Sequence, residues 1–339
     1  MSTYLNFPFD QEIFVQSWEA APDPTKTAMI DSGALVEDAV IAGRIQNDGC
    51  LYTIPFYSVL EGEPDNYDGV TDITTAEPAG GSQTGVVYGR GKGFTARNFA
   101  AELSGADPLG HIAATVGKYW AKQRQKQLLS ILEAIFGVKA SSGYGKKWHE
   151  KHILDLTNEG APYAIGATDL NALATQALGD NKNLFSLAIM HSDVAKTLEN
   201  LQMLEFWKYT DANGIQRPTA VASVSGFTVV IDDGVPVSEA DGSGNVSYTT
   251  YLLGEGAIRT ARGRVDVPAE VHRDPAANGG QDTLYTRIRE TIHPNGFSFT
   301  VPGADWSNSP SDAQLADSNN WSIAFDPKAI PIAKLVTNG

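Results

Sequence analysis

The longest helical pattern in the sequence covers residues 107–136 and constrains the fold more than any other stretch. Asp107 can accept hydrogen bonds from the first free amides, Pro108 suits the first helical position, and Gly137 ends the pattern. At about 1.5 Å per residue, such a helix is about 45 Å long, far beyond the three or four turns usual in globular domains. We therefore expect a helix that runs the length of a domain.

This predicted helix is apolar on one side and basic on the other. Its apolar stripe begins at Leu109 and rotates along the helix toward Ile135. The basic residues are Lys118, Lys122 and Lys126, which fall opposite the stripe, and Arg124, which falls near its edge. No acidic residue lies between Asp107 and Glu133. A face with only basic charges favours an acidic partner.

The region upstream of the helix carries the opposite charge. No Lys or Arg lies between Arg44 and Arg90. Seventeen residues of this region include six acidic side chains, which are Glu61, Glu63, Asp65, Asp68, Asp72 and Glu77. The region is rich in Gly and Pro without helical periodicity, and a loop of this length is usually functional or disordered. We interpret residues 51–99 as a long two-stranded excursion that leaves the body of the protein and returns.

Two strands are expected in this excursion. Residues 50–57, CLYTIPFY, have strand composition, and Pro55 restricts them to an edge or a strand end. The returning strand is expected in VVYGRGKGFTARNF, residues 86–99, which contains Arg90, Lys92 and Arg97.

The acidic excursion and the basic helix face form a complementary pair. A protruding loop cannot easily fold back along the helix of its own chain, so the simplest partner is the helix of a neighbouring copy. The alternative is that both are solvated faces, since an exposed ion pair contributes only about 0 to 1 kcal/mol. Charge alone leaves both interpretations open.

The composition is that of a folded, acidic protein. The 339 residues suffice for two domains or one large one, and the formal charge of -15 opposes binding to nucleic acid or anionic membranes except at local basic sites. The single cysteine, Cys50, excludes an internal disulfide and a cysteine metal site and suits a reducing cytoplasm. We expect no signal peptide and no membrane span.

The remaining sequence mixes helical and strand patterns without a repeat. An extended arm is expected over residues 1–26, an amphipathic helix over 27–43, and a loop containing SSGYGKKWHEKH after Gly137. Further helices are expected over Asp169–Leu178, capped by Thr168 and ended by Gly179, and over 193–203, capped by Ser192. The expected strands are 184–191, Phe227–Ile231, 248–253, 265–271 and 284–292, followed by a polar tail over 306–320 and an apolar stretch, AIPIAKLV. This order predicts an α+β fold.

No motif indicates catalysis. His149, Glu150 and His152 form H-E-x-H, whereas the zinc motif H-E-x-x-H places two imidazoles on one helical face, so we interpret these residues as part of a solvated loop. His191-Ser192-Asp193 has the composition of a catalytic triad, but adjacent residues cannot adopt triad geometry.

Two further patterns have simple structural explanations. Gly89, Gly91 and Gly93 alternate without a phosphate-binding fingerprint, so flexible strand glycines account for them. Asp232 and Asp233 follow a strand and are explained by a turn. We predict no catalytic, metal-binding or cofactor-binding residue and expect a structural role.

The order of several segments carries a family resemblance. These segments are SGALVEDAVIAG leading to YTIPF, then LEGEPDNYDGVTDIT, and RGKGFTARNFAAELSGADPLGHIAATVGKYWAKQRQKQLLSILEAIFG, followed by GFTVVIDDGVP, YLLGEGAI and IHPNGFSF. In this order the chain resembles the major capsid proteins of tailed bacteriophages, whose fold is shared with encapsulins and the herpesvirus capsid floor. The resemblance spans most of residues 30–300.

The resemblance implies a division of the chain. Its parts are an N-terminal arm (1–49), an extended loop (50–98), a peripheral domain (99–160) with a spine helix (107–136), an axial domain (161–262), return strands of the peripheral domain (263–302) and a C-terminal segment (303–339). In such proteins the extended loop lies over the peripheral domain of a neighbouring subunit. The candidate contact residues are therefore the six acidic residues of the loop together with Arg90, Lys92, Arg97, Lys118, Lys122, Arg124 and Lys126.

The resemblance also implies a function and partners. The expected function is self-assembly into hexamers and pentamers of an icosahedral head around double-stranded DNA, in the cytoplasm of a bacterial host and then in the virion. Further expected partners are portal and head-decoration or head-completion proteins. About fifty residues precede the loop, so any scaffold is expected to be a separate protein. Lys92 is the only Lys of the loop, with no Asn and acid placed beside it, and we expect no isopeptide cross-link.

Three alternatives stay open at this point. The first is an encapsulin-like compartment that holds a protein cargo, and the second is a soluble α/β enzyme with an unrecognised site. The third concerns only the basic helix face, which could touch DNA on the inner surface of a shell in place of a neighbouring loop.

Overall fold

The structure is a computed structural model that describes residues 3–4, 7–8, 35–45, 50–57, 63–67, 69–70, 72–75, 77–78, 80–98, 108–140, 143–157, 163–166, 168–210, 216–238, 245–300 and 309–339. Among them, the α-helices are α3 (Ala39–Ile45), α5 (Pro108–Phe136), α6 (Gly143–His152), α7 (Asp169–Leu178), α8 (Ser192–Asn200) and α9 (Asp312–Ala316). Short 3-10 helices are η1 (Gly179–Leu184), η2 (Ala277–Gly279), η3 (Ser318–Asn320) and η4 (Pro327–Ala329).

Within the described ranges, the strands form two larger sheets and three strand pairs. The seven-stranded sheet has the order β7 (Ile153–Asp155), β18 (Ile332–Thr337), β12 (Tyr248–Gly254), β8 (Phe185–Met190), β11 (Phe227–Ile231), β10 (Gln216–Val224) and β9 (Glu205–Thr210). The five-stranded sheet has the order β14 (Ala269–Asp274), β15 (Gln281–Pro294), β13 (Ile258–Arg262) and β3 (Leu35–Glu37), with β6 (Tyr88–Arg97) also paired to β15. The pairs are β4 (Leu51–Tyr57) with β5 (Gly80–Val86), β16 (Phe297–Phe299) with β17 (Trp321–Ile323), and β1 (Thr3–Tyr4) with β2 (Phe7–Pro8).

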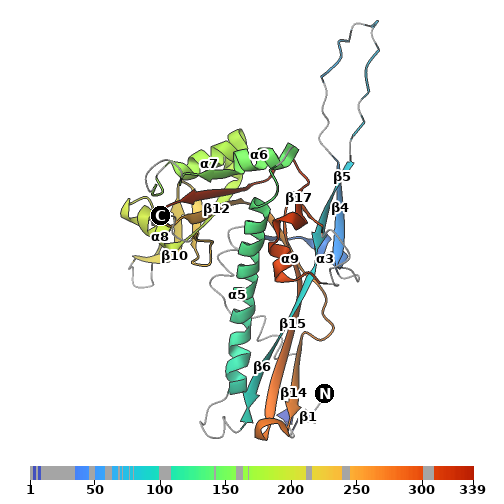
Figure 1. Cartoon of the computed structure of the whole chain (residues 1–339), viewed down its shortest axis with the longest axis vertical. Coiled ribbons are helices and arrows are strands. Elements are labelled where there is room, and N and C mark those ends of the chain that lie inside the picture. Colours follow the sequence, from blue (N-terminus) through green and yellow to red (C-terminus); the bar gives the residue numbers. More distant parts are fainter. Residues whose placement is uncertain are drawn as a thin grey trace.

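The molecule is elongated, and three parts of it diverge (Figure 1). Helix α5 runs along the long axis beside β6 and β15, the seven-stranded sheet with α7 and α8 lies to one side, and the loop between β4 and β5 projects from the opposite end to the start of α5. The tip of this loop therefore lies far from the middle of the α5 of its own chain.

The long helix changes character along its length. From Leu128 to Phe136 most side chains are buried, because this last third of the helix inserts into the main core between the two larger sheets. Its first half is covered on one side only, where Trp120 donates from Nε1 to Oγ1 of Thr286 on β15 at 3.1 Å and Tyr119 meets Phe94 of β6 edge to face. The apolar stripe predicted from the sequence is the side that packs on this sheet.

The middle of the seven-stranded sheet is buried on both faces. Along β8, Leu187 and Ile189 join the core that contains the end of α5, whereas Ala188 and Met190 join a second core under α7 and α8. Because side chains alternate across a strand, a sheet covered on both faces needs the continuous apolar run that the sequence shows here.

Several predicted elements have the expected positions. α5 begins at Pro108, α7 and β11 have the predicted bounds, and β4, β8, β12 and β15 lie where strands were expected. The proposed cap at Asp107 and nearly all of the arm over residues 1–26 fall outside the described residues.

Other predictions were wrong. Within residues 27–43, residues 35–37 form the strand β3, which pairs in parallel with β13, and the helix begins only at Ala39, capped by the carboxylate of Asp38. The stretch GYGKKWHEKH is the helix α6, not a loop, because Trp148 and His152 lie one turn apart and are both buried, with stacked rings 4.3 Å apart. Residues 265–268 are not a strand, since β14 begins at Ala269.

Two helix caps also differ from the prediction. Thr168 precedes α7 but makes no capping hydrogen bond with its side chain. Helix α8 spans Ser192–Asn200, and its cap is His191, whose Nδ1 accepts from the N–H of Asp193 at 3.1 Å.

The second strand of the excursion was also misplaced. The strand that returns from the loop is β5, paired with β4 from Tyr57↔Gly80 to Leu51↔Val86. β6 belongs to the body, since it pairs with β15 along its whole length. The strand β18, which lies in the predicted C-terminal segment, joins the seven-stranded sheet beside β12.

Candidate intersubunit surfaces

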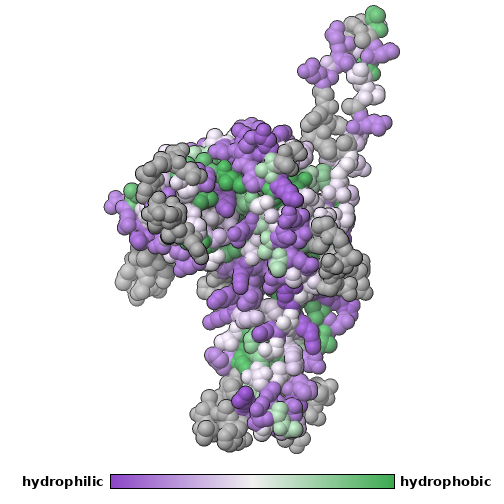
Figure 2. Space-filling view, in the orientation of Figure 1, coloured by the Kyte–Doolittle hydropathy of each residue, from purple (hydrophilic) through white to green (hydrophobic). Residues whose placement is uncertain are grey.

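The projecting loop exposes acidic and apolar side chains together. Glu63, Asp65, Asp72 and Glu77 are all exposed, while Glu61 and Asp68 lie outside the described residues. Large apolar side chains are exposed beside them, at Tyr67 (88%), Val70 (89%) and Ile73 (66%). Figure 2 shows the loop standing clear of the body with hydrophobic residues among hydrophilic ones. Exposed apolar groups of this size at a loop tip indicate a contact surface.

One carboxylate joins the two limbs of the loop. Asp65 accepts hydrogen bonds from both the backbone N–H and the Oγ1 of Thr74, each at 2.6 Å. These hydrogen bonds lower the pKa of Asp65, because they stabilise its charged form.

The base of the loop is fixed to the body by buried polar contacts. Nε2 of Gln83 on β5 lies 2.6 Å from Nε2 of His293 on β15, and both side chains are buried. Nearby, the hydroxyl of Tyr52 lies 3.2 Å from Oγ1 of Thr291. Burial lowers the pKa of His293 to about 3, so its ring is neutral at physiological pH. The direction in which the loop leaves the body is therefore set by the sheet beneath it.

The basic face of α5 has no partner within the described parts of its own chain. Lys118, Lys122 and Lys126 are all exposed, and none of them forms an ion pair there. They lie on the side of α5 opposite the packed stripe, as the sequence predicted. This face is available to another molecule.

Arg124 points the other way and is used inside the subunit. Its Nε lies 3.2 Å from Oε2 of Glu290, in an ion pair without the alignment of a hydrogen bond, and the two side chains are 19% and 7% exposed. The hydroxyl of Tyr88 donates to the other oxygen of Glu290 at 3.4 Å. Burial, and then the charge of Glu290, raise the pKa of Tyr88, which keeps this hydroxyl protonated.

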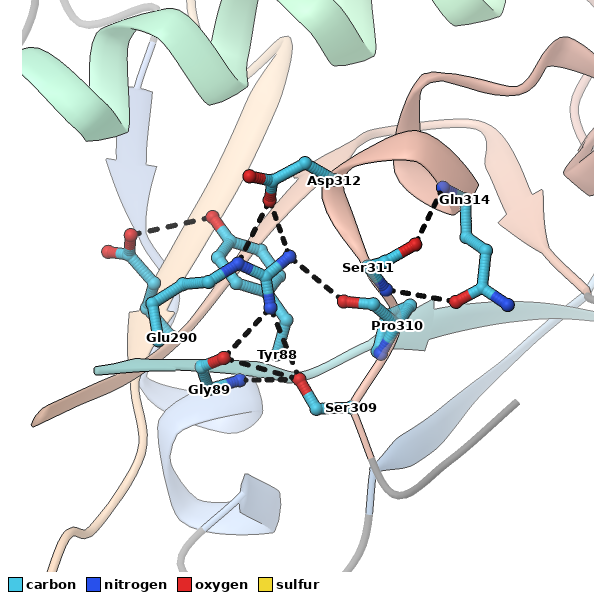
Figure 3. A network of polar contacts seen from close by, with 9 residues as sticks. Tyr88, Gly89, Glu290, Ser309, Pro310, Ser311, Asp312 and Gln314 are labelled. Carbon is cyan, nitrogen blue, oxygen red and sulfur yellow. Dashed lines mark hydrogen bonds and ion pairs between the residues drawn. The ribbon is translucent and has the colours of Figure 1, made fainter. Parts of the chain in front are cut away.

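Arg90 is also held within its own chain (Figure 3). Its guanidinium donates to one oxygen of Asp312 from Nε at 2.9 Å and from Nη2 at 2.6 Å. It also donates to the carbonyls of Gly89 and Pro310 and to Oγ of Ser309. Arg90 and Arg124 therefore fasten the C-terminal segment and α5 to the sheet within one subunit.

The C-terminal segment is ordered at this point by a helix cap. Oγ of Ser311 accepts from the N–H of Gln314, and the side chain of Gln314 accepts from the N–H of Ser311, which is a capping box at the start of α9. Figure 3 shows this box directly beside the contacts of Asp312.

Lys92 and Arg97 remain candidates for contact with other molecules. Both lie on β6, are exposed, and form no ion pair with the described residues. The sequence analysis did not identify Tyr67, Val70 and Ile73 as contact candidates. They could have been found as large apolar residues in a stretch that has no helix or strand pattern.

The histidine-rich stretch gives no metal site. His152 is buried and its Nδ1 lies 2.7 Å from the carbonyl of Ile332, so it is a core residue and not part of a solvated loop. Within the described parts of the chain, no cluster of three or more His, Cys, Asp or Glu side chains could hold a metal ion. None of the helices described is both long enough and apolar enough to cross a membrane.

Comparisons with known proteins connect this architecture to a group of relatives. The chain is 30% identical over 310 residues to the major capsid protein of Bacillus phage SPP1, which covers 91% of this chain and 90% of the relative. No family model matches the sequence.

Solved structures share the fold at much lower sequence identity. A capsid chain of Ralstonia phage GP4 is similar with a TM-score of 0.57 and 11% identity, covering 92% of this chain and 88% of that one. A capsid chain of cyanophage Pam1 gives a TM-score of 0.52 at 9% identity, covering 87% and 86%. A chain from Mycobacterium phage Che8 gives 0.52 at 10% identity, covering 88% of both.

Proposed function

Because the chain belongs to the major capsid protein family of tailed bacteriophages, we propose that its copies assemble into hexamers and pentamers of an icosahedral head that encloses double-stranded DNA. The protein is a capsid component of the virion. It assembles with itself, and its relatives are structural proteins and not enzymes. The encapsulin-like alternative is not favoured, since the relative with 30% identity is a phage capsid protein.

The domains of the family can be assigned to the parts of this chain. We assign α5 and the five-stranded sheet to the peripheral domain, and the seven-stranded sheet with α7 and α8 to the axial domain. The extended loop is then the hairpin of β4 and β5 with the residues between them, and β6 belongs to the peripheral domain.

One observation supports a direct role in assembly. The extended loop carries acidic and apolar side chains away from the body, while Lys118, Lys122 and Lys126 of the same chain have no acidic partner within its described parts. Both surfaces are present in every copy, so the acidic loop of one copy can contact the basic helix face of the next copy around a ring. We propose that the loop of one subunit lies over the α5 lysines of its neighbour.

Further partners follow from the family and not from a contact in this chain. We propose a portal protein, head-decoration or head-completion proteins, and, if assembly needs one, a separate scaffolding protein. The net charge of -15 suits a shell around DNA, because like charges discourage adsorption of the genome to the wall. If the α5 lysines touch DNA instead of the neighbouring loop, packaging will depend on salt while assembly will not.

Electron microscopy of the purified protein tests the proposed function directly. We expect closed shells when the protein is expressed alone or with the scaffolding protein of its phage, and sedimentation as capsomers or megadalton particles. If only a small oligomer formed under both conditions, the proposal of a shell protein would be rejected.

A further inference from the structure

Strand β6 lies at an edge of its sheet, and among the described residues it has no strand on its outer side. The direction of its backbone groups follows from the neighbouring strand. The N–H of Arg287 donates to the carbonyl of Pro268 on the β14 side at 2.8 Å, so the adjacent residue Thr286 directs its backbone groups toward β6. Thr286 is paired with Lys92, and the even-numbered residues of β6 therefore face β15.

The odd-numbered residues of β6 direct their N–H and C=O groups outward. The contacts of Gly89, the first odd-numbered residue of the strand, agree with this direction. Oγ of Ser309 accepts from the N–H of Gly89 at 2.9 Å and donates to its carbonyl at 3.3 Å. The next two odd positions, Gly91 and Gly93, are exposed and have no such cover within the described residues. An exposed edge of this kind is a template for another strand.

The described part of the subunit does not explain the glycine at position 91. The φ angle of Gly91 is not in the left-handed region. Among the described residues, a Cβ built there meets only the carbonyl of Thr286 at 3.6 Å and Cγ of Arg287 at 3.8 Å, which are ordinary contacts. Glycine weakens a strand, and in such a position it often marks the close approach of another backbone.

The extended loop contains a matching segment. Residues 72–75 read Asp-Ile-Thr-Thr, of which three are β-branched, yet they lie in no strand and are all exposed. The N–H of Thr74 is turned to Asp65 on the other limb. Neighbouring amides of a strand point to opposite sides, so a strand that pairs through the amides of Ile73 and Thr75 keeps this contact of Thr74.

The charges at the two places are complementary. Asp72 and Glu77 are exposed on the loop, and Lys92 and Arg97 are exposed on β6, with no ion pairs to the described residues on either side. The loop projects away from the β6 of its own chain (Figure 1), so the partner is a second copy.

We propose that residues 72–75 of one copy add as a strand to the outer edge of β6 in a neighbouring copy, beside Gly91, Gly93 and Thr95. The inference rests on the proposed capsid function and names the backbone contact that the extended loop makes. Main-chain hydrogen bonds hold the loop, and glycine lets the two backbones approach.

Engineered disulfides test this contact. In a Cys50→Ser parent, Ile73→Cys is combined in turn with Gly91→Cys, Gly93→Cys or Thr95→Cys, and assembled particles are oxidised. A disulfide needs Cα atoms within about 7 Å, so we expect ladders of linked subunits on a non-reducing denaturing gel for at least one pair. The control joins Ile73→Cys to Val267→Cys, an exposed position outside β6, and is expected to give no ladder.

Two results would overturn strand addition. Particles that form without a ladder from any of the three pairs, or that give an equal ladder from the control, would show that the loop does not lie along this edge while leaving the capsid function intact. If the Cys50→Ser parent and the unaltered protein both form no particles, the capsid function itself fails.

Hydrogen exchange gives a second test that needs no substitution. We expect the amides of Gly91 and Gly93 to exchange at least about tenfold more slowly in particles than in unassembled subunits. The Gly91→Pro variant removes the outward N–H and leaves the ladder to β15 intact, so it is expected to lower the yield of particles at least about tenfold, whereas Gly91→Ala keeps the N–H, adds only one methyl group at the contact and is expected to lower the yield less. Equal exchange in both states would contradict the proposal.

Discussion

Two sets of cations on α5 and beside it differ in what they contact. Arg124, with Arg90 on β6, meets an acidic side chain of its own subunit and is mostly buried. Lys122 and Lys126 are each two residues from Arg124, and at 3.6 residues per turn this spacing turns them to the other side of the helix, where they are exposed. One helix therefore carries both a charge that holds the subunit together and charges that are available to its neighbours.

The largest effect is expected at Glu290, the internal partner of Arg124. Replacing Glu290 with Ala leaves Arg124 without its partner in a largely buried site, and Tyr88 loses its acceptor. We expect the free energy of unfolding to fall by about 3 kcal/mol, because an unpaired charge in such a site is costly. Urea unfolding of dissociated subunits measures the change. The Glu290→Gln control keeps a hydrogen-bond acceptor for Tyr88, so its free energy of unfolding should fall less. Equal stability of the unaltered protein and both variants would show that the contacts of Glu290 do not stabilise the subunit.

Acid should weaken the attachment of the loop base. His293 has a pKa of about 3 in the folded subunit and about 6.5 in the unfolded chain, so below pH 6.5 only the unfolded chain takes up this proton. The stabilisation is complete above pH 6.5 and is lost progressively as the pH falls toward 3. At pH 5 the loss is about 2 kcal/mol at this residue.

His152, whose pKa burial lowers to about 4, adds a similar dependence between pH 6.5 and 4. Urea unfolding of the variants at pH 7 and pH 5 separates the contribution of His293 to the acid sensitivity from that of His152. In His293→Gln the difference between the two pH values should shrink, whereas the control His272→Gln, at an exposed position, should keep it. A His293→Gln protein with the full acid sensitivity would show that His293 does not cause it.

The sequence predicted elements whose pattern is local. The bounds of α7 follow from its apolar periodicity and from Gly179, which adopts a φ of 62° and donates its N–H to the carbonyl of Thr175. The lysine face of α5 was also readable, because helix periodicity alone decides which side a residue takes.

The sequence failed where a distant partner decides the structure. Residues 35–37 become a strand only because β13, more than two hundred residues later, pairs with them. The internal partners of Arg90 and Arg124, which are Asp312 and Glu290, cannot be identified from local spacing. The loop base was missed for the same reason, since Gln83 and His293 meet only in the folded chain.

The smallest effect on the subunit, and the most informative one for assembly, is expected at the lysine face. Reversing Lys118, Lys122 and Lys126 to Glu should change the free energy of unfolding by less than about 1 kcal/mol, because these exposed side chains have no partner in the described parts of the chain. The same variant should assemble poorly, because its helix now repels the acidic loop of the neighbour. Unfolding in urea and electron microscopy measure the two effects separately.

A matched control carries the same change of net charge elsewhere, with Lys139, Lys146 and Lys151 reversed to Glu in and before α6. We expect it to form particles, since the effect depends on where the charges lie and not on their sum. Salt gives an independent measure, because the Debye length falls from about 10 Å at 0.1 M to about 3 Å at 1 M. Raising salt over this range should weaken assembly of the unaltered protein. If the α5 triple variant assembles normally at 0.1 M salt, its lysines do not bind the loop, and contact with packaged DNA becomes the better explanation of the basic face.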